Sequence, residues 1–143
     1  MDLGLTAGLA RSYAAITRGL YYPGSEGDSI YLPFHVKIED IKEGKSFQEM
    51  VDAAGWWQSK IVVGAEWLSS VIDWSQSPDG GNSREMAARY RALRDAMNAT
   101  LVAVWRTTLT APESRGFHPT RHYLFGQDEI GGWAGIVTYS IET

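Results

Sequence analysis

Hydrophobic residues recur along this chain with two different periods, which separate the expected helices from the expected strands. Near the start they lie three and four positions apart, as on one face of a helix that ends near Gly19. Between Ile30 and Ile38 apolar and polar residues alternate, which predicts a strand with one apolar face. Pro33 has no backbone N–H, so we expect this strand at an edge of the sheet or with the proline nitrogen facing outward.

The middle of the chain predicts several short elements in succession. Ser46 and Glu49 match a capping box, which opens a short helix through about Ala54. Lys60 and the apolar residues Ile61, Val62 and Val63 that follow it indicate a short buried strand. Residues 66–74 then return to a helical pattern, so a further helix is expected there.

The clearest helix of the chain follows a loop of turn-forming residues at positions 75–82. Asn82, together with Glu85, is expected to cap this helix at its start. Its charged residues lie mostly off the apolar stripe, as in a helix with one face buried. The stripe consists of Met86, Tyr90, Leu93 and Met97.

Three strands without helices between them close the sequence, at residues 101–109, 120–125 and 133–141. Consecutive strands joined by short turns predict an antiparallel meander. The helices come earlier and are expected to cover the faces of the sheet. The fold class is therefore expected to be α/β (α+β), with one domain over residues 1–143. We expect a three-layer α/β/α sandwich around a mixed, largely antiparallel sheet that ends in a C-terminal strand.

Composition argues against several classes of protein. The chain contains no Cys, which removes disulfides, thiol catalysis and Cys-ligated zinc. A net charge of −4 argues against direct binding of nucleic acid, which requires a basic face for the phosphates. The sequence shows neither a basic signal peptide nor an apolar run of membrane-spanning length. We therefore expect a cytoplasmic protein without membrane contact.

No motif in the sequence points to catalysis or to a bound cofactor. There is no phosphate-binding Gly-rich loop and no nucleophile elbow. His118 and His122 are four residues apart, which on an extended segment places them on one face as a metal or catalytic pair; the alternative is two surface or hydrogen-bonded histidines. His35 falls on the polar face of its strand and is interpreted as solvent-facing. The sequence thus predicts a protein that is not an enzyme.

Four stretches of the chain match a known family in their order and spacing. They are Gly19-Leu20-Tyr21-Tyr22 with Ser25-Glu26, Tyr31-Leu32-Pro33-Phe34-His35-Val36, Lys60-Ile61-Val62-Val63 with Trp67-Leu68, and Trp133-Ala134-Gly135-Ile136 with Ile141-Glu142-Thr143. Together they resemble the nuclease A inhibitor family. Its members are small intracellular proteins that block a non-specific, metal-dependent DNA/RNA endonuclease, so the resemblance implies a nuclease inhibitor.

The resemblance also implies which residues bind the nuclease. In the family, a glutamate after the first helix and the C-terminal carboxylate reach the magnesium ion in the nuclease active site. The matching residues here are Glu26 and Thr143. Glu142 and Ser25 are neighbours expected at the same interface, and Trp74 is either a further anchor or a core residue. The implied partner is the endonuclease with its bound magnesium, and the inhibitor itself carries no metal or cofactor.

Two departures from the family pattern keep a second function open. The Pro23-Gly24 turn holds one more residue before Ser25-Glu26 than the family pattern does. The segment 75–82 is poorer in acids and aromatics than expected for an inhibitor that faces a basic nuclease. The alternative is a non-catalytic module on the same scaffold that binds an unrelated protein or a ligand.

Overall fold

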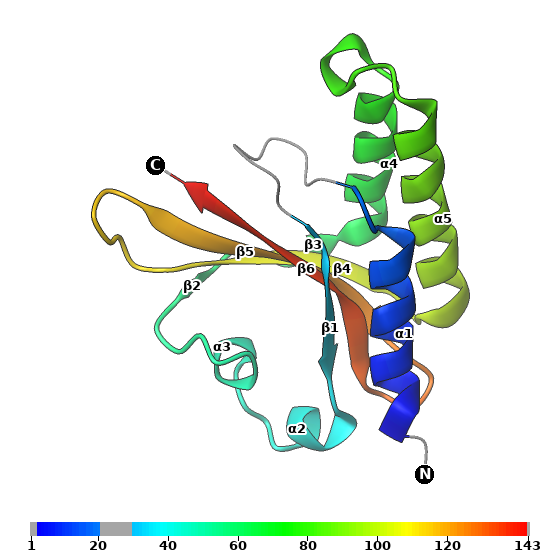
Figure 1. The fold of residues 1–143 in the computed structure, drawn as a ribbon. Helices are drawn as coiled ribbons and strands as arrows, with labels where there is room; N and C mark the ends of the chain where they lie inside the picture. The colour runs from blue at the N-terminus through cyan, green and yellow to red at the C-terminus, as the bar shows by residue number, and fades with distance from the viewer. Residues whose placement is uncertain (1–2, 21–29, 143) are drawn as a thin grey trace.

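A computed structural model describes residues 3–20 and 30–142 of the chain (Figure 1). Within these residues helices and strands combine in an α+β fold, and six strands form one sheet in the order β1-β6-β5-β4-β2, with β3 also paired to β4. The strands are β1 (Leu32–Val36), β2 (Trp57–Gln58), β3 (Val62–Val63), β4 (Val104–Thr110), β5 (His118–Gln127) and β6 (Trp133–Glu142).

Strand β6 lies between β1 and β5, so the last strand of the chain occupies the interior of the sheet. The expected meander of β4, β5 and β6 is confirmed, and Pro33 pairs with Ile136 on the edge strand β1, as its missing N–H predicts. Every strand pairing among the described residues is antiparallel. The expectation of a largely antiparallel sheet is therefore confirmed, whereas that of a mixed sheet is wrong.

Helices pack against both faces of this sheet. In Figure 1 the long helices lie on one side of the sheet and the short helices on the other. The long helices are α1 (Leu3–Ile16), α4 (Gly64–Ser75) and α5 (Arg84–Thr100). The short helices are α2 (Ile38–Lys42) and α3 (Phe47–Met50), and a 3-10 turn, η1 (Pro78–Gly80), follows α4.

The long helices bury a mainly aliphatic cluster, which we call the helical core. The stripe of α5 is buried as predicted, with Tyr90, Leu93 and Met97 fully inaccessible to solvent. Arg89 ties α5 to α1, because its Nε and Nη2 donate to the carbonyl oxygen of Ile16 at 3.1 and 2.9 Å. The other buried members include Tyr13, Leu68, Val71, Ile72, Leu124 and Ile136.

The opposite face of the sheet buries a second cluster, which we call the aromatic core. The ring of Phe125 lies 5.6 Å from those of Phe34 and Phe47, and the Phe34 ring lies 4.9 Å from that of Tyr123. Such centroid distances are typical of favourable aromatic pairs. The buried members are Phe34, Val36, Phe47, Ala53, Leu109, Tyr123, Phe125 and Val137.

Strand β3 corrects the prediction of a buried strand at residues 60–63. The strand forms, but Val62 and Val63 are 44% and 54% exposed. Within the described residues β3 pairs only with β4, so its outer side has no neighbouring strand. Burial begins one residue later, at Gly64, where a Cβ would lie 2.7 Å from the Leu124 side chain. Gly64 therefore lets α4 start close against the sheet.

Other boundaries also differ from the sequence expectation. Ser83, rather than Asn82, caps α5, and its Oγ accepts a hydrogen bond from the Met86 N–H at 3.1 Å. Asn82 adopts a φ of 53°, so it is a left-handed turn residue that precedes the cap. Ser46 caps α3 as predicted, but that helix ends at Met50 instead of near Ala54. The strand expected to run to Ile38 ends at Val36, and Ile38–Lys42 form α2.

Candidate functional site

The carboxylates that the sequence implicates fall at the margins of what the structure describes. Ser25, Glu26 and Thr143 lie outside the described residues. Glu142 is the last residue of β6, where its backbone pairs with His118 of β5. For Ser25, Glu26 and Thr143 the structure therefore gives only the positions of the described elements that adjoin them in the chain.

Those neighbouring elements are joined directly. Ile30 is the first described residue after the segment that carries Glu26, and its carbonyl oxygen accepts a hydrogen bond from the Thr138 hydroxyl at 2.6 Å. Thr138 belongs to β6, four residues before Glu142. The register between β1 and β6 continues from there with Leu32 opposite Val137. The segment with Glu26 thus rejoins the sheet beside the strand that carries Glu142.

Trp74 is not brought to this part of the sheet. It lies near the end of α4, a helix that packs mainly on α5 and β4, and its side chain is half-buried. Its carbonyl oxygen accepts hydrogen bonds from the Ser77 N–H at 3.0 Å and the Ser77 hydroxyl at 2.6 Å. Figure 1 shows the loop of residues 75–82 at the end of the helix pair that points away from the sheet. The end of α4 that carries Trp74 therefore lies apart from the end of β6, where Glu142 is found.

The three histidines do not assemble into a catalytic group in the structure. His118 Nδ1 lies 3.3 Å from the Ala111 carbonyl oxygen, and His122 Nε2 lies 2.7 Å from the Ser140 hydroxyl. His35 is exposed on β1, as expected. Over residues 3–20 and 30–142, no three His, Asp or Glu side chains come together as a metal site would require. The hydrogen-bonded interpretation of His118 and His122 agrees with these contacts.

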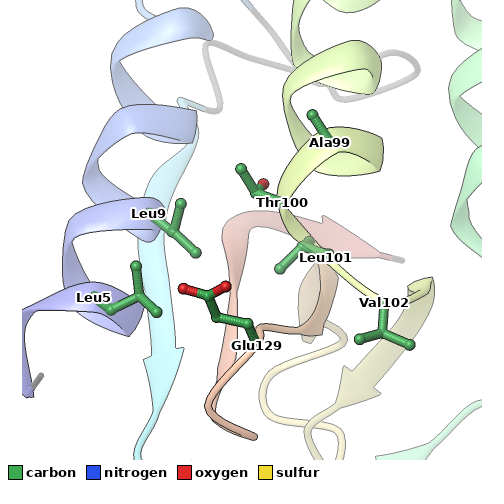
Figure 2. Close-up of a pocket in the computed structure, with 7 residues that line it drawn as sticks. All are labelled: Leu5, Leu9, Ala99, Thr100, Leu101, Val102 and Glu129. Atoms are coloured by element: carbon green, nitrogen blue, oxygen red, sulfur yellow. The ribbon is translucent and has the colours of Figure 1, made fainter.

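An open pocket of about 330 Å³ lies between α1, the end of α5 and the turn from β5 to β6. Figure 2 shows its walls, which are mainly apolar, with the Glu129 carboxylate directed toward α1. Because three separate segments contribute, no local sequence pattern predicts this pocket. Its lining residues are Leu5, Leu9, Ala99, Thr100, Leu101, Val102 and Glu129.

The turn that carries Glu129 is held by the buried side chain of Asp128. Asp128 Oδ1 accepts hydrogen bonds from the N–H groups of Ile130 and Gly132, both at 3.0 Å. Asp128 Oδ2 accepts a short hydrogen bond from the Thr6 hydroxyl of α1. A carboxylate with this many donors fixes the backbone on both sides of Glu129. The position of Glu129 in the pocket wall is therefore well defined.

Tyr13 connects the pocket wall to the helical core. Its hydroxyl is hydrogen-bonded to the Thr100 hydroxyl in the last turn of α5. Burial raises the pKa of Tyr13 above its ordinary value of 10.0, and the charge of Asp128 acts in the same direction, whereas the hydrogen bond to Thr100 opposes it. The phenol therefore stays neutral at physiological pH and links α1 to α5.

A strip of apolar side chains is exposed at the margin of the sheet that β2 and β3 form. Trp57, Ile61, Val62 and Val63 are 68%, 51%, 44% and 54% exposed. Trp57 belongs to β2, Val62 and Val63 belong to β3, and Ile61 lies in the segment between these strands. Both strands pair with β4. Exposed apolar residues along the margin of a sheet can serve as a protein interaction surface.

Comparison with known proteins leaves the family open, because no protein-family model and no curated protein matches the chain. The resemblance to nuclease A inhibitors therefore rests on the residue pattern alone. Among the helices of residues 3–20 and 30–142, none combines the length and the apolar character needed to cross a bilayer.

Proposed function

We propose that this single domain inhibits a non-specific, metal-dependent endonuclease by placing carboxylates in its active site. The observation that supports this most is the hydrogen bond between Thr138 and Ile30. It joins β6, which leads to Glu142 and Thr143, to the end of the segment that carries Ser25 and Glu26. Ile30, which follows the segment with Ser25 and Glu26, thus lies beside β6 at a point four residues before Glu142.

The proposed mechanism follows from the chemistry of magnesium. Mg²⁺ prefers oxygen ligands and keeps coordination positions open for substrate phosphates. Carboxylate oxygens can take those positions and so exclude the nucleic acid. Strand β6 is paired with both β1 and β5 over Trp133–Val137 and with β5 from there to Glu142, so an acid at its end is presented by a strand that is anchored in the sheet. A rigid element loses little conformational entropy when it docks.

We also propose a finer description of the fold and of its location. The helical core and the aromatic core on opposite faces of the sheet support a three-layer α/β/α sandwich. A cytoplasmic location belongs to the same proposal, because a chain without Cys does not depend on an oxidising compartment.

Plasmid digestion by a metal-dependent non-specific nuclease at fixed magnesium concentration tests the proposal. Stoichiometric loss of cleavage is expected as the protein is added. Glu26→Gln should weaken inhibition at least about tenfold, because it removes one charge of a closely packed interface. Extension of the chain by Ala after Thr143 should weaken it as well, since it moves the terminal carboxylate.

Glu113→Gln provides the matched control for these variants. Glu113 is an exposed acid in the connection between β4 and β5, so the same chemical change there should leave inhibition unchanged. The proposal fails if Glu26→Gln and the extended chain inhibit a susceptible nuclease as well as the unaltered protein does.

The exposed strip at β2 and β3 favours a second candidate function, binding of an unrelated protein. A partner that pairs with this margin would bury Trp57, Val62 and Val63. Val62→Lys should then abolish capture of that partner while leaving nuclease inhibition unchanged. Inhibition lost in Val62→Lys and retained in Glu26→Gln would instead place the nuclease itself on the strip.

A further inference from the structure

We propose that the pocket of Figure 2 binds small organic ammonium ions that carry an apolar body. The site is separate from the proposed nuclease interface, because it lies at the start of β6 whereas Glu142 lies at its end. Its volume of about 330 Å³ is at the lower end of the range for small-molecule sites.

A carboxylate supplies the negative charge of the pocket. Figure 2 shows the Glu129 carboxylate directed into the space between its own turn and the Leu5 and Leu9 side chains of α1. Within the described residues Glu129 has no ion-pair or hydrogen-bond partner. Its charge is therefore available to a ligand that enters the pocket.

The end of α5 adds to this negative potential. The helix has 17 residues and ends at Thr100 in the pocket wall, with no basic residue in its last turn. The C-terminal end of a helix carries a partial negative charge, which favours a nearby cation. The helix itself provides no compensating charge there, so Glu129 and the helix end act in the same direction.

The apolar walls decide which kind of cation fits. Leu5, Leu9, Leu101 and Val102 offer hydrocarbon surface, and Val102 is 77% exposed. A divalent metal ion needs about six oxygen ligands, far more than one carboxylate and one hydroxyl provide. An ammonium group attached to a short hydrocarbon chain can contact Glu129 and cover the leucines, which gains hydrophobic free energy.

The pocket is preformed, so little rearrangement is needed on binding. The N–H of Val102 donates to the Gln127 carbonyl oxygen at 2.8 Å, which holds the segment after α5 against the end of β5. Asp128 fixes the turn on the other side of Glu129 through its contacts with Thr6 and Gly132. A preorganised wall lowers the conformational cost of ligand binding.

Two-dimensional NMR titration of the full chain tests the proposal with three ligands of equal length. They are hexylammonium, 1-hexanol and hexanoate, which share a hydrocarbon chain and differ in charge. Hexylammonium should bind most tightly and hexanoate least, with saturable shifts at the amides of Val102, Glu129 and Ile130. Equal binding of the three ligands, or shifts confined to other parts of the molecule, would overturn it.

Variants then test the role of the carboxylate. Glu129→Gln should weaken hexylammonium binding about fivefold, the upper range for a partly exposed ion pair, and leave 1-hexanol unaffected. Glu113→Gln, an equivalent change at an exposed acid outside the pocket, should change neither. Ala99→Arg, at an exposed position of the wall, should block hexylammonium by placing a tethered cation beside Glu129. Unchanged hexylammonium affinity in Glu129→Gln would contradict the assignment.

Discussion

The two faces of the sheet are covered by different means. On one face, three helices of 12 to 17 residues bury the helical core with many medium-sized side chains. On the other face, helices of five and four residues and their connections bury the aromatic core. Few residues cover the second face, so large rings such as Phe47 and Phe125 provide much of its buried area. The comparison indicates that the aromatic core depends more on single side chains.

Removal of one ring should have the largest effect on stability. Phe125→Ala is expected to lower the free energy of unfolding by about 4 kcal/mol, because Phe125 is 2% exposed and contacts four other rings. Leu93→Ala in the helical core is expected to cost about 3 kcal/mol, since neighbouring side chains can close part of the cavity. Urea denaturation measures both values.

A conservative variant separates ring contacts from simple burial. Phe125→Leu keeps an apolar side chain and should recover most of the loss seen in Phe125→Ala. If Leu93→Ala lowers the free energy of unfolding clearly more than Phe125→Ala does, the helical core is the one that depends more on single side chains.

The serine N-caps of α5 and α3 are expected to differ in their contribution to stability, but by less than the core side chains do. Ser83 Oγ accepts from the Met86 N–H at 3.1 Å, and Ser46 Oγ accepts from the Glu49 N–H at 3.2 Å. Ser83→Ala should cost about 1 kcal/mol, because it caps a long helix that unfolds with the whole domain. Ser46→Ala should cost less than about 0.5 kcal/mol, since the short α3 is held mainly by Phe47. Equal losses in thermal unfolding would show that α3 is as integral as α5.

The smallest expected difference between the two cores lies in the pH dependence of stability, to which one buried tyrosine of each core contributes. Burial raises the pKa of Tyr13 in the helical core and of Tyr123 in the aromatic core above 10.0, but Arg121 opposes the rise at Tyr123. Above pH 10.0 the unfolded chain loses these protons before the folded protein does. The stability they contribute is therefore complete below pH 10.0 and is lost as the pH rises through the folded pKa values.

Phenylalanine variants measure these two contributions separately. In urea denaturation at increasing pH, Tyr13→Phe should flatten the loss of stability above pH 10.0 more than Tyr123→Phe does, because Arg121 lowers the pKa of Tyr123 whereas no cation among the described residues lowers that of Tyr13. A steeper residual loss in Tyr13→Phe than in Tyr123→Phe would mean that the aromatic core is the more strongly desolvated environment.

Most of the fold follows from local patterns, and the exposure of β3 is an exception that depends on topology. The stripe of α5 and the alternation in β1 persist over enough residues to define a period, and Pro33 marks the edge. The exposure of Val62 and Val63 was missed because apolar residues alone do not reveal whether another strand follows in the sheet. Burial at a sheet margin depends on topology, which is decided by distant segments.

The candidate sites show the same limit more strongly. Glu26 and Thr143 came from a resemblance and lie outside the described residues, so they stay predictions. The pocket around Glu129 had no sequence signal, because Leu5 and Val102 approach it from elements far apart in the chain. A pocket built from several segments becomes visible only once the elements are placed in space.

The interior position of β6 has a consequence for synthesis on the ribosome. Strand β1 is made early, yet Leu32 finds its partner only when Val137 has left the exit tunnel. Until then the apolar side chains of Phe34 and Val36 have no sheet to cover, and contacts between such distant residues form slowly. The nascent chain is therefore expected to pair β1 only after Val137 has been synthesised, and the apolar side chains of β1 stay exposed to unwanted contacts until then.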